Sequence, residues 1–238
     1  MRLMRVDNYV ARVCDAAENG ETGRFTSLLS NPELIELDDG VYILVGTARG
    51  HNVACFIAPS LPDRVSFKEM MQGIKDSMLS KEDNPYQIPE ALMARWAQVS
   101  PEAFAAINTV HYGQAETDGI TLPWTFTGYG GGGALAQLAA AAFKPARLIT
   151  FGAPDAGGEL LNEKIADACD WRRWEFMSDW NAKLPVRKFM SEVSGCTMFI
   201  DDAGVLETDA EFKFRRISDW FERTPMSAYM DWLEGEGE

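Results

Sequence analysis

Residues 122–155 have the sequence LPWTFTGYGGGGALAQLAAAAFKPARLITFGAPD, and this segment indicates the fold more strongly than any other part of the sequence. Leu122 to Thr127 form a short apolar run that is typical of a buried strand. Four consecutive glycines then open an alanine- and leucine-rich segment that predicts a buried helix to Phe143. A second apolar run at 147–151 is followed by Gly-Ala-Pro at 152–154. Strand, tight turn, helix and strand in this order predict a right-handed crossover unit of a parallel sheet.

The glycine-rich turn fits two known kinds of site. Gly128, Gly130 and Gly133 match the G-x-G-x-x-G pattern of dinucleotide-binding folds. The same turn matches the G-x-S-x-G nucleophile elbow of α/β-hydrolases, except that Gly130 stands where that pattern has its serine. A dinucleotide site expects an acidic residue at the end of the second strand, but Asp155 comes only after the Gly-Ala-Pro turn. The flanks favour the hydrolase interpretation, and a nucleotide-binding protein that uses the Gly128–Gly133 turn stays as an alternative.

The turn and its flanks resemble the class 3 lipases, a family of α/β-hydrolases. The segment TGYGGGGALAQLAAA, followed by ITFGAPDAGG, is similar to the family pattern TGHSLGGALA followed by a T-F-G-x-P-x-x-G segment. The resemblance implies one α/β-hydrolase-like domain over residues 1–238, with a mostly parallel central sheet flanked by helices. It also implies that Gly130 takes the position of the nucleophile.

A second segment resembles the strand that carries the family's oxyanion residue. Residues Val41 to Thr47 are similar to the strand that ends in the R-G-T motif, with Val45 in place of the arginine. In that family a Thr-type residue and a backbone N–H that follows the nucleophile bind the oxyanion. The resemblance therefore implies an oxyanion pocket made by Thr47 and Gly131.

A third segment, residues 178–185 (SDWNAKLP), resembles the family's D-x-V-x-x-L-P segment and puts Asp179 at the position of the triad's acid. The resemblance thus implies a pocket around Gly130 to which Asp179 also belongs. Hydrolysis in this fold needs a nucleophile, a base and an acid, in the chain order Ser, Asp, His. Gly130 has no side chain, and both histidines, His51 and His111, precede the turn. Two of the three catalytic groups are missing from the matching positions.

The sequence therefore predicts a catalytically inactive, lipase-like protein with a binding, scaffold or structural role. The alternatives are an active esterase with an unidentified nucleophile and an esterase inactivated by an engineered change at Gly130. A protein or a small acyl-type molecule is the expected partner. No H-x-H, H-E-x-x-H or D-x-D-x-D spacing occurs, so neither a metal nor another cofactor is expected.

Composition limits the classes of partner and location. The chain has 238 residues, of which 46% are hydrophobic and 24% charged, as expected for one soluble domain. A net charge of −14 argues against a nucleic-acid partner. No apolar run is long enough for a transmembrane helix, and the first twenty residues lack a signal-like apolar core, so we expect a cytoplasmic location. The four cysteines show no paired spacing, which favours reduced thiols and leaves one disulfide open. The sequence does not predict the oligomeric state.

Apolar periodicity predicts further elements on both sides of the glycine-rich unit. We expect a hairpin turn at Asp38–Gly40. The expected helices cover 6–17, 66–78, 89–99, 101–110, 159–168 and 226–233, and the expected strands cover 33–37, 41–46, 52–58, 171–177 and 196–200.

Overall fold

The computed structural model describes residues 2–59, 64–66, 84–118, 121–176, 196–201, 204–206, 220–222 and 225–235. The expected helix over 66–78 lies, after its first residue, outside these ranges, and so does the segment that contains Asp179.

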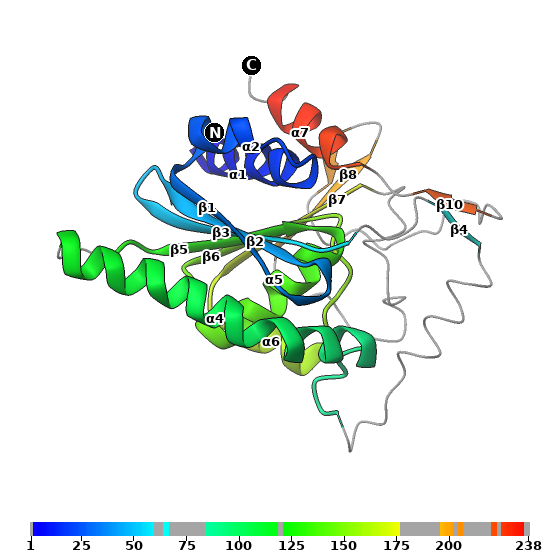
Figure 1. Cartoon of the computed structure of the whole chain (residues 1–238). Coiled ribbons are helices and arrows are strands. Elements are labelled where there is room, and N and C mark those ends of the chain that lie inside the picture. The colour runs from blue at the N-terminus through cyan, green and yellow to red at the C-terminus, as the bar shows by residue number, and fades with distance from the viewer. Residues whose placement is uncertain are drawn as a thin grey trace.

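A sheet of eight strands forms the centre of the molecule, in the order β1-β2-β3-β5-β6-β7-β8-β9 (Figure 1). Strands β3, β5, β6, β7 and β8 run parallel to one another, whereas β1, β2 and β9 are antiparallel to their neighbours. A separate antiparallel pair joins β4 to β10. The strands are β1 (Ser30–Glu36), β2 (Tyr42–Ala48), β3 (His51–Ile57), β4 (Arg64–Ser66), β5 (Trp124–Tyr129), β6 (Arg147–Phe151), β7 (Asp170–Phe176), β8 (Cys196–Asp201), β9 (Gly204–Leu206) and β10 (Trp220–Glu222).

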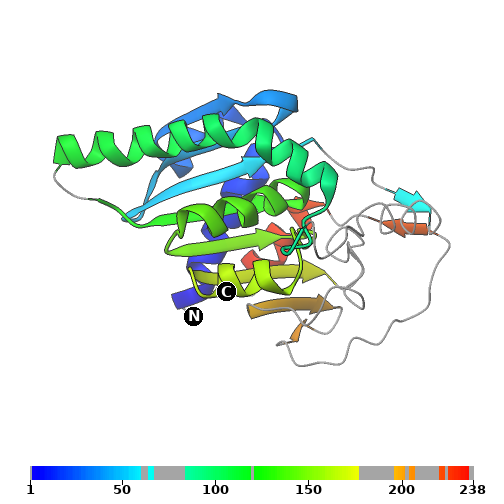
Figure 2. The same cartoon turned by 90° about the horizontal axis from the view of Figure 1, so that it is seen from below.

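Helices cover both faces of the large sheet (Figures 1 and 2). One face carries α1 (Arg2–Glu18), α2 (Thr22–Leu28) and α7 (Met226–Gly235), and the other carries α4 (Glu90–Asp118), α5 (Gly130–Phe143) and α6 (Glu159–Ala166). A short 3-10 turn, η1 (Asp38–Gly40), joins β1 to β2 at the expected hairpin.

The alternation of side chains along the strands fills two separate cores. In β3, Ala54 and Phe56 belong to the core beneath α4, α5 and α6, while Val53 and Cys55 belong to the core beneath α1 and α7. Successive side chains of a strand point to opposite faces, so an uninterrupted apolar run is what a strand covered on both sides requires. This explains why the apolar runs of the sequence identified the central strands.

The central crossover unit has the predicted form. Strand β5 lies between β3 and β6 and is parallel to both, and α5 begins at the residue that follows β5. The strand covers Trp124–Tyr129, so it begins and ends two residues later than the expected strand over 122–127. The predicted α/β fold with a mostly parallel sheet is confirmed.

One expectation about the helices is wrong. Residues 89–99 and 101–110 were expected as two helices that each begin at a proline, but α4 is one helix of 29 residues with Pro101 inside it. An internal proline removes a helical hydrogen bond and usually kinks or breaks the helix. Here Val99, Ala103 and Ile107 form one buried stripe that continues through the proline. Packing of this stripe on the core offsets the missing hydrogen bond.

Candidate functional site

The turn between β5 and α5 is the candidate site. Tyr129 ends the strand with an extended backbone (φ −108°, ψ 144°), and Gly130 begins the helix with a φ of 54°. Glycine adopts this left-handed conformation freely, whereas residues with a side chain adopt it at a cost. The turn lies at the carboxyl edge of the sheet, where the parallel strands β3, β5 and β6 end.

Two glycines of the turn are required because backbones meet there. A Cβ on Gly132 would lie 2.1 Å from the carbonyl oxygen of Phe56 in β3. A Cβ on Gly128 would lie 2.5 Å from the carbonyl carbon of Gly132. These distances are far below van der Waals contact, so α5 approaches the sheet this closely only with glycine at both positions.

The other two glycines of the turn, Gly131 and Gly133, differ in the room that their surroundings leave for a side chain. A Cβ on Gly133 would lie 2.5 Å from the Cβ of Ala153, in the turn after β6. A Cβ on Gly131 would make only an ordinary contact, 3.5 Å from the Cβ of Ala58. Packing therefore demands glycine in the pattern G-x-x-x-G-G, which the lipase-like segment shares, and leaves Gly131 free to vary.

The structure does not bring Thr47 to Gly130, so this part of the predicted pocket is wrong. Strand β2 is antiparallel to β3 and pairs Thr47 with Asn52, which in turn lies beside Trp124 at the start of β5. Thr47 therefore lies at the amino edge of the sheet, where its hydroxyl donates a 3.2 Å hydrogen bond to the carbonyl oxygen of Ser30. The R-G-T resemblance was matched to the first strand of a hairpin, whose direction is opposite to that of β5.

The segment that lies beside the elbow is the end of the other hairpin strand. Strand β3 ends at Ile57, and the side chain of Ala58 faces Gly131. Sequence reasoning missed these residues, although the Arg49-Gly50 turn between two apolar runs was a usable signal. Two strands joined by such a turn run in opposite directions, so only one of them can be parallel to β5, and in the structure it is β3.

Gly131 lies in the first turn of α5, where backbone N–H groups have no partner inside the helix. Such N–H groups can bind a negatively charged oxygen. The oxyanion role of Gly131 stays a prediction, and so does the role of Asp179, which lies outside the described residues.

Both histidines belong to elements that meet at the amino edge. His51 is the first residue of β3, and its Nε2 lies 3.3 Å from Nη1 of Arg147. Burial, and then the charge of Arg147, lower the pKa of His51. His111 lies in the part of α4 that leads to the start of β5 (Figure 1).

A cluster of aromatic side chains covers the carboxyl edge of the sheet on the face that carries α7. The fully buried ring of Tyr229 lies 6.2 Å from the ring of Tyr129, 6.0 Å from Phe151 and 4.7 Å from Phe176, measured between ring centres. Its hydroxyl accepts a 3.2 Å hydrogen bond from the backbone N–H of Phe176. Tyr229 thereby fixes α7 over the ends of β5, β6 and β7, a contact that the helical pattern of 226–233 did not reveal.

Buried charges hold the turn that follows β6. Arg173 of β7 is 1% exposed and forms ion pairs with the carboxylates of Asp155 and Glu175. Its Nη2 also donates a 3.0 Å hydrogen bond to the carbonyl oxygen of Ala153. The carboxylate of Asp155 is thus engaged inside the protein.

A buried amide fixes the same turn from the other side. Gln137 of α5 is fully buried, and its Nε2 donates a 2.9 Å hydrogen bond to the carbonyl oxygen of Pro154. Its Oε1 accepts a 3.0 Å hydrogen bond from the backbone N–H of Ala156. These two hydrogen bonds tie α5 to the turn that follows β6, on the β6 side of the candidate site.

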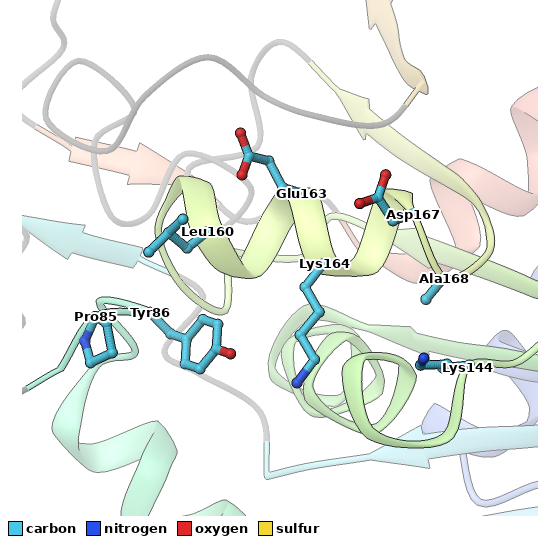
Figure 3. Close-up of a pocket in the computed structure, with 8 residues that line it drawn as sticks. All are labelled: Pro85, Tyr86, Lys144, Leu160, Glu163, Lys164, Asp167 and Ala168. Carbon is cyan, nitrogen blue, oxygen red and sulfur yellow. The ribbon is translucent and has the colours of Figure 1, made fainter.

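Two surface hollows lie away from Gly130. A groove of about 500 Å³ runs between α6, the end of α5 and residues 85–86 (Figure 3). In this groove the ammonium group of Lys164 lies 5.4 Å from the ring centre of Tyr86. A crevice of about 430 Å³ lies at the amino edge and is lined by Trp124, Phe126 and Phe143, among others. Both hollows include Lys144, which caps the end of α5 opposite Gly130.

Within the described part of the chain, no group of three or more His, Cys, Asp and Glu side chains is arranged to hold a metal ion. None of the described helices combines the length and the apolar character that a membrane span requires.

Solved structures share this arrangement at low sequence identity. Lipase II from Rhizopus niveus has a TM-score of 0.66 and 14% identity over 92% of this chain and 89% of its own. A lipase from Rhizopus microsporus var. chinensis has a TM-score of 0.66 and 15% identity over 98% and 84%. The triacylglyceride lipase of Rhizomucor miehei has a TM-score of 0.62 and 14% identity over 87% and 83%. No protein-family model and no curated protein sequence matches the chain. At this level of identity the likeness concerns the fold, and the chain has the α/β-hydrolase fold of the fungal lipases.

Proposed function

We propose that this chain is a catalytically inactive, lipase-like protein that acts by binding rather than by hydrolysis. The observation that carries the proposal is the position of His51 relative to Gly130. Strand β5 separates the two edges of the sheet, and its six residues span roughly 17 Å. A general base must come within about 3 Å of the proton that it removes. An imidazole at the amino edge is therefore too far away to activate a nucleophile at the elbow.

The elbow itself supports the same proposal. Gly130 has no atom that could attack an ester, and its φ of 54° is a conformation in which glycine relieves the strain that a serine would carry. With glycine at the nucleophile's position and no histidine after Asp179 in the sequence, an acid at Asp179 would have no imidazole to orient at the matching position.

The fold favours an acyl-type molecule as the ligand class. The similar structures are lipases, and one of them is described as a triacylglyceride lipase. We therefore propose a small acyl-type ligand at the Gly130–Gly131 turn, with a protein partner as the second candidate. Nucleic acid is disfavoured because a net charge of −14 repels phosphates.

A nucleotide at the glycine-rich turn is the weaker alternative. In such a site a carboxylate after the second strand would hydrogen-bond the ribose. The carboxylate that follows β6 belongs to Asp155, which is 4% exposed and paired with Arg173. Packing already accounts for Gly128 and Gly133, so close approach of a phosphate is not needed to explain them.

Hydrolysis is the first property to test. Purified protein should hydrolyse p-nitrophenyl butyrate no faster than a heat-denatured control, and a fluorophosphonate probe should label no residue. Labelling of a single serine, threonine or cysteine, located by peptide mapping, would instead establish the active-esterase alternative and identify its nucleophile.

Binding is the second property to test, by titration of the protein with decanoic acid in a calorimeter. Gly131→Leu should weaken binding at least tenfold, because the new side chain would project from the turn at the proposed ligand position, beside Ala58. Gly23→Ala is the matched control, since a Cβ there meets no atom within 4 Å. Equal affinity of both variants would place the ligand elsewhere, and no binding by the wild type would favour the protein partner.

A further inference from the structure

Two cysteines that are distant in the sequence meet in the core beneath α1. The Sγ atoms of Cys14 in α1 and Cys55 in β3 lie 3.6 Å apart, although the residues are 41 positions apart in the chain. Cys14 is 0% exposed and Cys55 is 1% exposed. The Sγ of Cys14 also lies 3.0 Å from the hydroxyl of Thr127 in β5. The packing of α1 on the sheet therefore creates this pair of thiols, which no spacing in the sequence reveals.

We propose that Cys14 and Cys55 form a reversible disulfide that links α1 covalently to the central sheet. The sulfur atoms of a disulfide are about 2.0 Å apart. The observed 3.6 Å separation must therefore shorten by roughly 1.6 Å when the bond forms, which requires rotation of the two side chains or a shift of α1.

The oxidant for this step is a low-molecular-weight disulfide such as oxidised glutathione. One protein thiol loses its proton and attacks the oxidant, which forms a mixed disulfide and releases one glutathione thiolate. The second protein thiol loses its proton and attacks the mixed disulfide, which releases the second glutathione thiolate. Two protein thiols and one oxidised glutathione thus yield one protein disulfide and two reduced glutathione molecules.

The environment of the pair makes the reaction depend on the opening of α1. The hydrogen bond with Cys14, together with burial, raises the pKa of the Cys55 thiol well above its usual range. A thiol in this state is a poor nucleophile while the core is closed. Once α1 separates from the sheet, Cys14 is carried into solvent and reacts first, and the return of the helix brings the mixed disulfide to Cys55.

The link also secures the helix beside α1. Asn8 of α1 donates a 3.1 Å hydrogen bond to the carbonyl oxygen of Leu233 in α7, and Arg12 pairs with Glu234 at 2.8 Å. Tyr229 of α7 covers the ends of β5 and β6. A disulfide that anchors α1 to the sheet would therefore also hold α7, and with it Tyr229, in place.

A redox titration of the full chain tests the proposal. Protein is equilibrated in glutathione buffers of increasing oxidation, denatured in acid, and alkylated, and its thiols are counted by mass. We expect the count to fall from the four cysteines of the sequence to two, with a Cys14–Cys55 peptide in the unreduced digest. The proposal would be overturned if four thiols were alkylated in every buffer, and also after the protein had been unfolded and refolded in the most oxidising buffer. A disulfide with any other pairing would overturn it as well.

Thermal unfolding gives a second readout. The oxidised wild type should unfold about 5–15 °C above the reduced form, because a cross-link that closes a loop of this length restricts the unfolded chain. The difference should vanish in Cys14→Ala and in Cys55→Ala. It should persist in Cys169→Ala, since the thiol of Cys169 contacts the carbonyl oxygen of Ile165 and not this pair. The wild-type peptide map decides the question even where an alanine variant fails to fold.

Discussion

Gly130 stands at the position of the lipase nucleophile and has a backbone conformation that glycine adopts freely. Its φ of 54° would be retained by a serine only with strain of about 1–2 kcal/mol. We expect Gly130→Ser to lower the free energy of unfolding by about that amount. We also expect no turnover of p-nitrophenyl butyrate, since His51, at the start of β3, lies at the opposite edge of the sheet from Gly130. Denaturant unfolding and the ester assay measure the two effects. A hydrolytic Gly130→Ser variant would show that a base already lies beside the elbow and would favour the engineered-change alternative.

Two neighbouring glycines provide a matched pair for the packing argument. In Gly132→Ala the new Cβ would lie 2.1 Å from the Phe56 carbonyl oxygen, so the helix or the central strand must move. We expect a loss of at least about 2–3 kcal/mol in the free energy of unfolding. In Gly131→Ala the Cβ meets only Ala58 at 3.5 Å, and the stability should stay the same or rise by about 0.4–1 kcal/mol. Equal effects of the two substitutions in urea unfolding would contradict the proposed close approach of α5 to β3.

At the scale of elements, Tyr229 is the contact through which α7 joins the carboxyl edge. Tyr229→Phe keeps the ring but removes the acceptor of the Phe176 N–H, and we expect it to lower the free energy of unfolding by about 1–2 kcal/mol. Tyr42→Phe is the control, because the hydroxyl of Tyr42 contacts Glu36 at the exposed surface, and its loss should cost less than about 0.5 kcal/mol. Indistinguishable unfolding curves of the two variants would show that the Tyr229 hydroxyl does not hold α7.

The helices and strands also show how much of the fold the sequence could predict. The unit of β5, α5 and β6 was predicted because long apolar runs and a glycine-rich turn permit few other structures. The placement of Thr47 failed because apolar periodicity locates a strand but does not give its direction, which the Arg49-Gly50 turn sets. The continuity of α4 through Pro101 failed for another reason. A proline signals a helix start locally, whereas the buried stripe that overrides it depends on tertiary packing.

For the whole molecule, the decisive contacts join residues that are far apart in the chain. Asp7 of α1 accepts a 2.6 Å hydrogen bond from Nη1 of Arg172 and a 3.1 Å hydrogen bond from Nε1 of Trp174. Arg172 also donates a 2.6 Å hydrogen bond to Asp170, so its charge is shared between two carboxylates. No local pattern predicts such a group, because its members are 165 positions apart in the chain.

The pH dependence of stability tests which force dominates at Asp7. Burial raises its pKa from 3.8 to about 6, against the opposing charge of Arg172. The folded protein then binds this proton more tightly than the unfolded chain, so the contribution of Asp7 to the free energy of unfolding is greatest below pH 4. It should decrease by about 3 kcal/mol as the pH rises from 4 to 6 and stay constant above that range. Urea unfolding of the wild type and Asp7→Asn between pH 4 and 7 isolates the effect, because asparagine does not titrate. If the wild type instead gains stability over the variant as the pH rises, the ion pair with Arg172 outweighs burial, and α1 is anchored to β7 mainly by charge.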